Sequence, residues 1–159
     1  SKFEFILQKC TEIGVTGFVP LTCERCVVAE PDNKRLGRWR SIITEAAEQS
    51  RRGNLPILHT PASFTEACKT ASKVSLLLWE GEKLRSIGDV VRSRQKIRND
   101  PAISIFIGPE GGFSSNEVEF ARSWGIVPVS LGRRILRAET AGLVAAAITM
   151  YEFGDLNNV

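Results

Sequence analysis

The sequence predicts an α/β domain with a mainly parallel sheet flanked by helices. Two observations support this prediction. Apolar runs of strand length alternate with helical patterns along the whole chain, and three of these runs are uninterrupted, as in strands that are buried on both faces of a sheet. The 159 residues, 43% of them hydrophobic, can form one core, and no internal repeat or linker divides them. We therefore expect a single domain over residues 1–159.

The first half of the chain predicts helices around short strands. Apolar residues recur at helical spacing from Phe3 to Ile13, and Gly14 follows as a stop. Residues 18–21 predict a strand, residues 26–29 a possible second strand, and residues 34–51 a long helix. Ser63 and Glu66 have the spacing of a capping box, which predicts that a helix begins there.

The second half predicts three buried strands, each followed by a helix. The strands are expected at residues 74–79, 103–107 and 127–131, and the helices at residues 84–97, 114–124 and 138–153. The last helix is apolar on nearly all sides and rich in small residues, which is typical of a helix in a core or a subunit interface. In so small a domain we favour an interface, and so a homodimer.

Composition narrows the class of protein. The net charge of +3 permits an anionic partner without requiring one. Cys23 and Cys26 have the C-x-x-C spacing of a metal or redox pair, but a zinc site needs a second pair and His59 is the only histidine. We expect no metal and reduced cysteines. With no signal segment and no apolar run that could span a bilayer, we expect a soluble, cytoplasmic protein that does not bind membranes.

A glycine-rich turn, residues 107–114 (IGPEGGFS), joins the second buried strand to a helix. Ligands of open α/β sheets bind at such carboxyl ends of strands, and glycines let the backbone come close to a ligand. A tight turn without a ligand is an equally good interpretation from glycine content alone. The turn is neither a P-loop nor G-x-G-x-x-G, and Glu110 would repel phosphate. A ligand with positive or neutral groups fits better, and S-adenosylmethionine meets that description.

A second turn of the same kind, residues 131–141 (LGRRILRAETA), follows the third buried strand. Three arginines within five residues can hold phosphate, and a solvated run of charge is the alternative interpretation. Ile135 and Leu136 interrupt them, so these two side chains should bury against the core or against an adenine face.

The string IGPEGGFSSNE followed by LGRRILRAETAG resembles the paired motifs of the RsmE-type methyltransferases. These SPOUT-class enzymes methylate N3 of a uridine in 16S ribosomal RNA. The opening KFEFILQKCTEIGVTGFVPLTCERC, the stretch EAAEQSRR and the strand LLLWEGE resemble the same family in the same order, so the resemblance covers nearly the whole chain.

The resemblance implies a C-terminal trefoil knot, a homodimer and S-adenosylmethionine as cofactor. It also implies a PUA-like N-terminal domain that is absent here, so the chain looks like the catalytic half of a two-domain enzyme. By position, the residues that line the cofactor pocket would be Leu78, Glu80, Ile107, Gly108, Gly112, Leu131, Gly132, Ile135, Leu136 and Arg137.

Methylation of N3 requires that its proton leaves and that negative charge on the base is stabilised. Arg137 is a candidate for stabilising that charge, and Glu139 for orienting Arg137 or accepting the proton. Arg38, Glu45, Gln49 and Arg52 share one helix face, which on spacing alone is best interpreted as a solvated face with ion pairs. The resemblance makes Gln49 and Arg52 candidates for contacting RNA or the target base.

The leading hypothesis is a methyltransferase that acts on a uridine of small-subunit ribosomal RNA. A knotted methyltransferase that acts on a ribose 2′-hydroxyl or on transfer RNA would share the same scaffold. A non-catalytic RNA-binding module would not need both glycine-containing turns.

Overall fold

The computed structural model describes residues 1–27, 30–94, 102–153 and 156. Its helices and strands, in chain order, are α1 (Lys2–Glu12), β1 (Gly17–Phe18), β2 (Leu21–Thr22), α2 (Asn33–Gln49), β3 (Ile57–Leu58), β4 (Ala62–Ser63), α3 (Phe64–Thr70), β5 (Val74–Leu78), α4 (Ile87–Arg94), β6 (Ile103–Phe106), α5 (Ser115–Ser123), β7 (Val127–Val129) and α6 (Ala138–Glu152). The predicted α/β class is confirmed.

The centre of the domain is a parallel sheet with the strand order β6-β5-β7. In β5, Leu77 pairs with Phe106 of β6 on one side and with Pro128 of β7 on the other. Two further parallel pairs, β1 with β3 and β2 with β4, lie beside it. Since every pair is parallel, the carboxyl ends of β5, β6 and β7 lie at the same edge.

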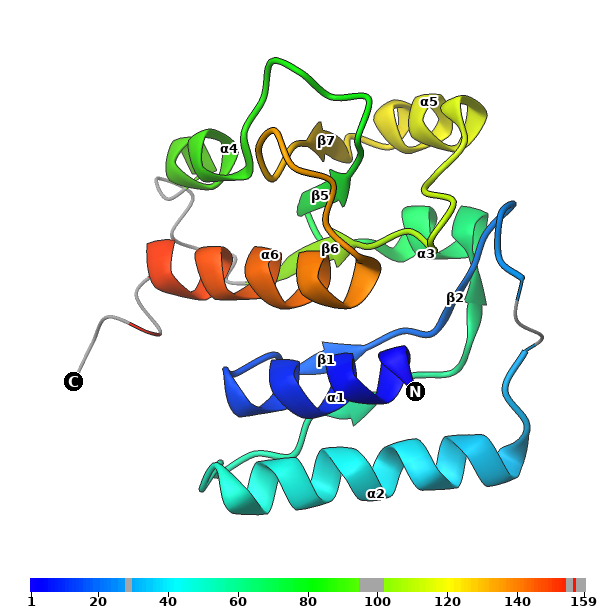
Figure 1. The fold of residues 1–159 in the computed structure, drawn as a ribbon, viewed down its shortest axis with the longest axis vertical. Coiled ribbons are helices and arrows are strands. Elements are labelled where there is room, and N and C mark those ends of the chain that lie inside the picture. Colours follow the sequence, from blue (N-terminus) through cyan, green and yellow to red (C-terminus); the bar gives the residue numbers. More distant parts are fainter. Residues whose placement is uncertain (28–29, 95–101, 154–155, 157–159) are drawn as a thin grey trace.

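Helices cover both faces of this sheet (Figure 1). Leu77 and Phe106 pack with Phe64 of α3 and Val118 of α5 on one face. Leu76 packs on the other face, in a cluster with Ile87 and Val91 of α4 and Ala145 of α6. Consecutive side chains of a strand point to opposite faces, so the uninterrupted apolar run of β5 serves both layers.

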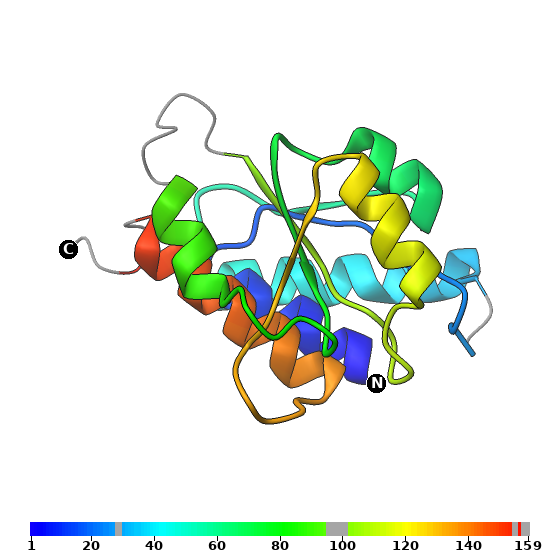
Figure 2. The ribbon, with the colours of Figure 1, turned by 90° about the horizontal axis from the view of Figure 1, so that it is seen from above.

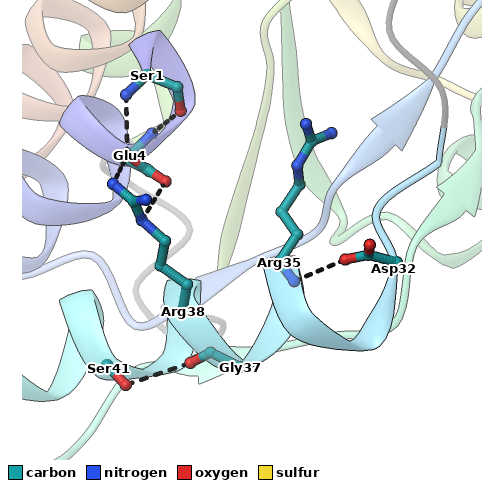
Figure 3. A network of polar contacts seen from close by, with 7 residues as sticks. All are labelled: Ser1, Glu4, Asp32, Arg35, Gly37, Arg38 and Ser41. Carbon is teal, nitrogen blue, oxygen red and sulfur yellow. Dashed lines mark hydrogen bonds and ion pairs between the residues drawn. The ribbon is translucent and has the colours of Figure 1, made fainter.

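Helices α1 and α2 form a further layer beyond α6. Leu7 and Trp39 are buried in a cluster that includes Ala146 of α6, and the rings of Phe3 and Trp39 are 4.4 Å apart. At the start of α1, Glu4 forms an ion pair with Arg38 of α2, with Oε1 of Glu4 2.8 Å from Nε of Arg38 (Figure 3). Arg38 therefore binds across to α1.

The prediction of one strand over residues 18–21 was wrong in its extent. The structure has two strands of two residues each, β1 and β2, on either side of Val19 and Pro20. Pro20 lacks an N–H and cannot donate to a ladder, although its carbonyl accepts from Ala62. Residues 26 and 27 are not in a strand, and residues 28 and 29 of the other predicted strand lie outside the described residues.

The helix predicted over residues 84–97 begins later, at Ile87. The reason is that the backbone of Arg85 and Ile87 bonds to Ser130 at the end of β7, and the Ser86 hydroxyl accepts from the amide of Asp89. Residues 95–97 lie outside the described residues. The capping boxes at Ser63 and Ser114 are confirmed, with Glu66 and Glu117 as their second members.

Helix α6 packs against the sheet and α4 on one side and against α1 on the other, which leaves one stripe of it facing outward. Gly142, Ala145, Ala146 and Thr149 face the core, while Val144 and Ala147 are half-buried and Tyr151 is 58% exposed. Among the described residues, no helix is long and apolar enough to cross a membrane.

Candidate active site

Three turns meet at the carboxyl ends of β5, β6 and β7 and enclose a pocket of about 760 Å³. Figure 2 shows the turns after these three strands at the same end of the molecule. The turns contribute residues 78–81 with Lys83, residues 107–113, and residues 129–138. The ten residues predicted for the cofactor all line this pocket: Leu78, Glu80, Ile107, Gly108, Gly112, Leu131, Gly132, Ile135, Leu136 and Arg137.

The glycine-rich turn folds tightly on itself. Gly112 has a φ of +65°, in the left-handed region that favours glycine, and its amide donates to the carbonyl of Pro109 at 2.9 Å. A Cβ on Gly108 would lie 3.2 Å from the backbone carbon of Gly112. Both positions therefore need glycine, one for its dihedral angle and the other for space.

A segment from far away in the sequence braces this turn. Arg25 donates from Nη1 to the carbonyl of Gly111 at 2.7 Å, and Lys2 forms an ion pair with Glu110. Beyond the turn, Glu24 accepts from the hydroxyl of Ser114, and its own amide donates to Glu117. The start of α5 and the glycine-rich turn are thus held by the loop that follows β2.

The second turn leaves β7 at Gly132, whose φ is +104°. Its amide donates to the Ser130 hydroxyl at 3.1 Å. Ile135 is 79% exposed and Leu136 is half-buried, and both line the pocket. Ile135 therefore does not bury against the core, and its contact with an adenine face stays a prediction.

The end of β7 lies between the two ends of the loop that follows β5. Trp79, at the start of this loop, donates its amide to the carbonyl of Val129 at 3.1 Å. At the other end of the loop, Ser130 donates to the carbonyl of Arg85 at 2.8 Å and accepts from the amide of Ile87 at 3.0 Å. The wall formed by residues 79–86 is therefore fixed to the wall formed by residues 129–138.

The four candidate catalytic residues fall into two groups. Arg137 is the exposed N-cap of α6 and lines the pocket, and its side chain makes no capping bond. Glu139 lies in the first turn of α6, is half-buried and does not line the pocket itself, and its Oε2 is buried without a hydrogen-bond partner among the described residues.

Gln49 and Arg52 lie elsewhere, at the far end of α2, and line neither this pocket nor the larger groove beside it. Gln49 is exposed. Arg52 is half-buried, and its guanidinium donates to the carbonyls of Thr11, Gly14 and Val15. One copy of the chain does not bring these two residues to the pocket.

Several residues that line the pocket were not predicted from the sequence, including Lys2, Arg25, Trp79, Lys83 and Phe113. Trp79 and Lys83 lie in the string WEGEK next to predicted residues, so proximity along the chain could have found them. Lys2 and Arg25 reach the pocket only through tertiary folding. The lining has six basic side chains, Lys2, Arg25, Lys83, Arg133, Arg134 and Arg137, against the acidic pair Glu80 and Glu110.

The thiols of Cys23 and Cys26 lie 3.2 Å apart, and all four cysteines are free. Burial, and then the hydrogen bond with Cys26, raises the pKa of the Cys23 thiol to about 12. Within the described part of the chain, no group of three or more histidine, cysteine or acidic side chains is placed to hold a metal ion.

The fold and site define a class, a parallel α/β domain with a glycine-lined ligand pocket at the carboxyl ends of its strands. Residues 1–150 match the family model described as an RNA methyltransferase domain, and the chain belongs to that family.

The ribosomal RNA small subunit methyltransferase E of Synechocystis sp. is 44% identical over 92% of the chain and 48% of its own length. Its namesake in Bacillus subtilis is 34% identical over 95% of the chain and 61% of its own length. A solved ribosomal RNA small subunit methyltransferase E of Neisseria gonorrhoeae, bound to S-adenosylmethionine, superposes with a TM-score of 0.81 at 37% identity. That likeness covers 94% of the chain and 60% of the solved one. The chain thus spans about half to three-fifths of the length of these relatives.

Proposed function

We propose that the chain transfers a methyl group from S-adenosylmethionine to N3 of a uridine in small-subunit ribosomal RNA. The observation that carries this proposal is the pocket at the carboxyl end of the sheet, together with the N. gonorrhoeae relative that binds S-adenosylmethionine. The names of the relatives support the ribosomal substrate, and the uridine follows from the resemblance of the two turns to the RsmE type. An enzyme of ribosomal RNA would act in the cytoplasm.

The residues present suit this cofactor. Gly108 and Gly112 let the backbone approach a ligand, and the exposed Ile135 and half-buried Leu136 offer apolar surface to an adenine. The carboxylate of Glu80 favours a positively charged ligand, whereas that of Glu110 is paired with Lys2. The cofactor supplies an activated methyl group on a sulfonium, and the protein's task is to hold the acceptor in line with it.

The acceptor nitrogen must lose its proton. We assign this step to Glu139, because its buried Oε2 is an acceptor without a donor among the described residues. Arg137, at the pocket and without a capping bond, stabilises negative charge on the uracil ring. The basic side chains that line the pocket hold the phosphates of the RNA strand.

We propose that the enzyme works as a homodimer. Helix α6 turns Val144, Ala147 and Tyr151 outward at helical spacing, a stripe that a second copy would cover. Gln49 and Arg52 do not reach the pocket of their own chain, so their proposed contacts with RNA would be made at the site of the other copy or outside both pockets.

We also propose that the C-terminal half forms a trefoil knot. The support is the backbone pairing around Val129 and Ser130, which puts the end of β7 between the two ends of the loop of residues 79–86. The knot would form if the chain that continues from there into α6 passes through that loop.

The test is transfer of tritiated methyl groups to small ribosomal subunits that lack the modification, followed by nucleoside analysis. We expect the label in 3-methyluridine. Arg137→Ala and Glu139→Gln should lower the rate at least about 100-fold while cofactor affinity changes little. Label on a ribose would redirect the proposal to a 2′-hydroxyl, and cofactor binding without transfer to any RNA would leave a binding module.

A further inference from the structure

The wall of the pocket that follows β5, residues 79–86, is a loop without regular secondary structure, although Trp79, Glu80, Gly81 and Lys83 all line the pocket. Its ends are fixed by the bonds to Val129 and Ser130. Its middle has little apolar packing, since Leu84 is 93% exposed. Something else must define the conformation between the two ends.

Glu82 occupies the inside of this loop and is only 8% exposed. Its Oε1 accepts from the amide of Leu84 at 2.8 Å and from the amide of Arg85 at 3.1 Å, and its own amide donates to the carbonyl of Trp79 at 3.2 Å. The Leu84 amide, and to a lesser extent that of Arg85, holds the pKa of the Glu82 carboxyl below its usual range despite the burial. The ionised side chain of Glu82 thus ties down two points of the loop, and its backbone amide ties down a third.

The outer side of the loop is covered from α5. The Arg122 guanidinium lies 5.7 Å from the centroid of the Trp79 ring and 3.9 Å from Oε2 of Glu82. The Trp79 ring packs over Gly81 so closely that a Cβ there would lie 2.4 Å from it. Arg122 also pairs with Glu119 at 2.7 Å, on the exposed surface. The two glutamates therefore share an arginine, but only Glu82 bonds to the loop.

We propose that Glu82 is a positioning residue for the cofactor, which sets the conformation of the pocket wall through its bonds to the Leu84 and Arg85 amides. This inference rests on the proposed function for the identity of the ligand. Glu82 itself does not line the pocket, whereas Glu80 and Lys83 on either side of it do. Releasing the middle of the loop would leave these two side chains without a fixed direction, and the cofactor would have to order them on binding.

Three substitutions separate the reach of the side chain from its charge. Glu82→Gln keeps an oxygen at the same distance from the backbone and loses the charge. Glu82→Asp keeps the charge but is one methylene too short to accept from both amides, and Glu82→Ala removes both properties. If the amide bonds position the wall, the dissociation constant for S-adenosylmethionine should rise about tenfold in the Asp and Ala variants and less than about threefold in Gln.

Binding is measured by calorimetry on the full chain, with Glu119→Ala as the matched control, because it frees Arg122 of its closer carboxylate without touching the loop. The control should bind as tightly as the parent. In methyl transfer, the Asp variant should show a raised KM for the cofactor and an unchanged KM for RNA, a split that a general loss of stability would not produce.

Amide hydrogen exchange at Leu84 and Arg85 tests the same inference without any cofactor. The inference is supported if these two amides exchange faster in the Glu82→Asp variant than in Glu82→Gln while exchange in the core strands is the same in both. This comparison holds even if the Ala variant does not fold. If the Gln variant bound S-adenosylmethionine weakly and the Asp variant bound it normally, the effect would come from the charge and the inference would be overturned. Equal affinity in all variants would overturn it too. A parent chain that binds no S-adenosylmethionine would instead count against the proposed function.

Discussion

Replacing Arg52 with alanine removes the group that ties the end of α1 to the end of α2. The guanidinium donates from Nη1 to the carbonyls of Thr11 at 3.1 Å and Val15 at 2.6 Å, and from Nη2 to Gly14 at 3.3 Å. Bonds from a charged donor contribute about 1.5–3 kcal/mol each, but these three share one half-buried group. We therefore expect the Arg52→Ala variant to lose about 2–4 kcal/mol of unfolding free energy, much of it from the Gly14 and Val15 carbonyls, since the Thr11 carbonyl keeps a bond from the Gly14 amide.

For a chain of this length, that loss corresponds to a fall in Tm of about 5–15 °C. Thermal and urea unfolding followed by circular dichroism measure it, with Arg52→Lys as the intermediate case, because an ammonium cannot reach three carbonyls in a fork. Arg51→Ala is a suitable control, since Arg51 is the exposed neighbour. A Tm within about 1 °C of the parent would refute the argument.

The same variant separates stability from the proposed contact with RNA. Methyl transfer should be measured at a temperature where parent and variant are both folded. If Arg52 acts only on the fold, the rate per folded molecule is unchanged. A rate lowered about 100-fold at unchanged stability would place Arg52 at the substrate instead.

Three further predictions concern the pocket and the core. Gly108→Ala should lower cofactor affinity about 10–100-fold, because the new Cβ would lie 3.2 Å from the backbone of Gly112 and would push the turn open. If calorimetry gave this variant the affinity of the parent, the role of the turn would be contradicted. Ile135→Ala should change the unfolding free energy by less than about 0.5 kcal/mol, because the side chain is 79% exposed. It should weaken cofactor binding several-fold through the lost apolar contact, and binding as tight as in the parent would mean that Ile135 does not touch the ligand. Burial raises the pKa of the Cys10 thiol from 9.0 to about 11, so between these values the unfolded chain ionises before the folded one and stability falls with rising pH. Cys10 alone should contribute a drop of up to about 2–3 kcal/mol in the free energy of urea unfolding between pH 8 and pH 11, on top of the contributions of Cys23 and Cys68, whose thiol pKa values burial also raises. The slope in Cys10→Ala should therefore be smaller than in the parent, and an identical slope would remove Cys10 as a source.

The sequence predicted those parts of the fold and site that depend on patterns of a few neighbouring residues. The apolar runs of β5, β6 and β7, the capping boxes at Ser63 and Ser114, and the glycine at the exit of each turn are all contained within a few residues. The ten cofactor residues came from the resemblance to the RsmE type, and they line one pocket because parallel strands bring their carboxyl ends to one edge.

The parts that it missed depend on contacts between distant residues. Arg25 reaches Gly111, and Arg52 reaches the end of α1, through packing that no spacing rule encodes. Strands of two residues, such as β3 and β4, are too short to show a period. The start of α4 was placed too early because the backbone of Arg85 bonds to Ser130 instead of continuing the helix.

The backbone bonds on both sides of Ser130 also bear on how the chain folds. Synthesis runs from the N-terminus, so the loop of residues 79–86 exists before the end of β7 to which its two ends bond. Bringing residues that are distant in the sequence into contact costs chain entropy before the stabilising contacts form, so such steps are slow. We expect the arrival of residues 129 and 130 between Trp79 and Arg85 to be the slowest event in folding. Because that event also completes the pocket, ligand binding during refolding would report the moment at which the chain becomes native.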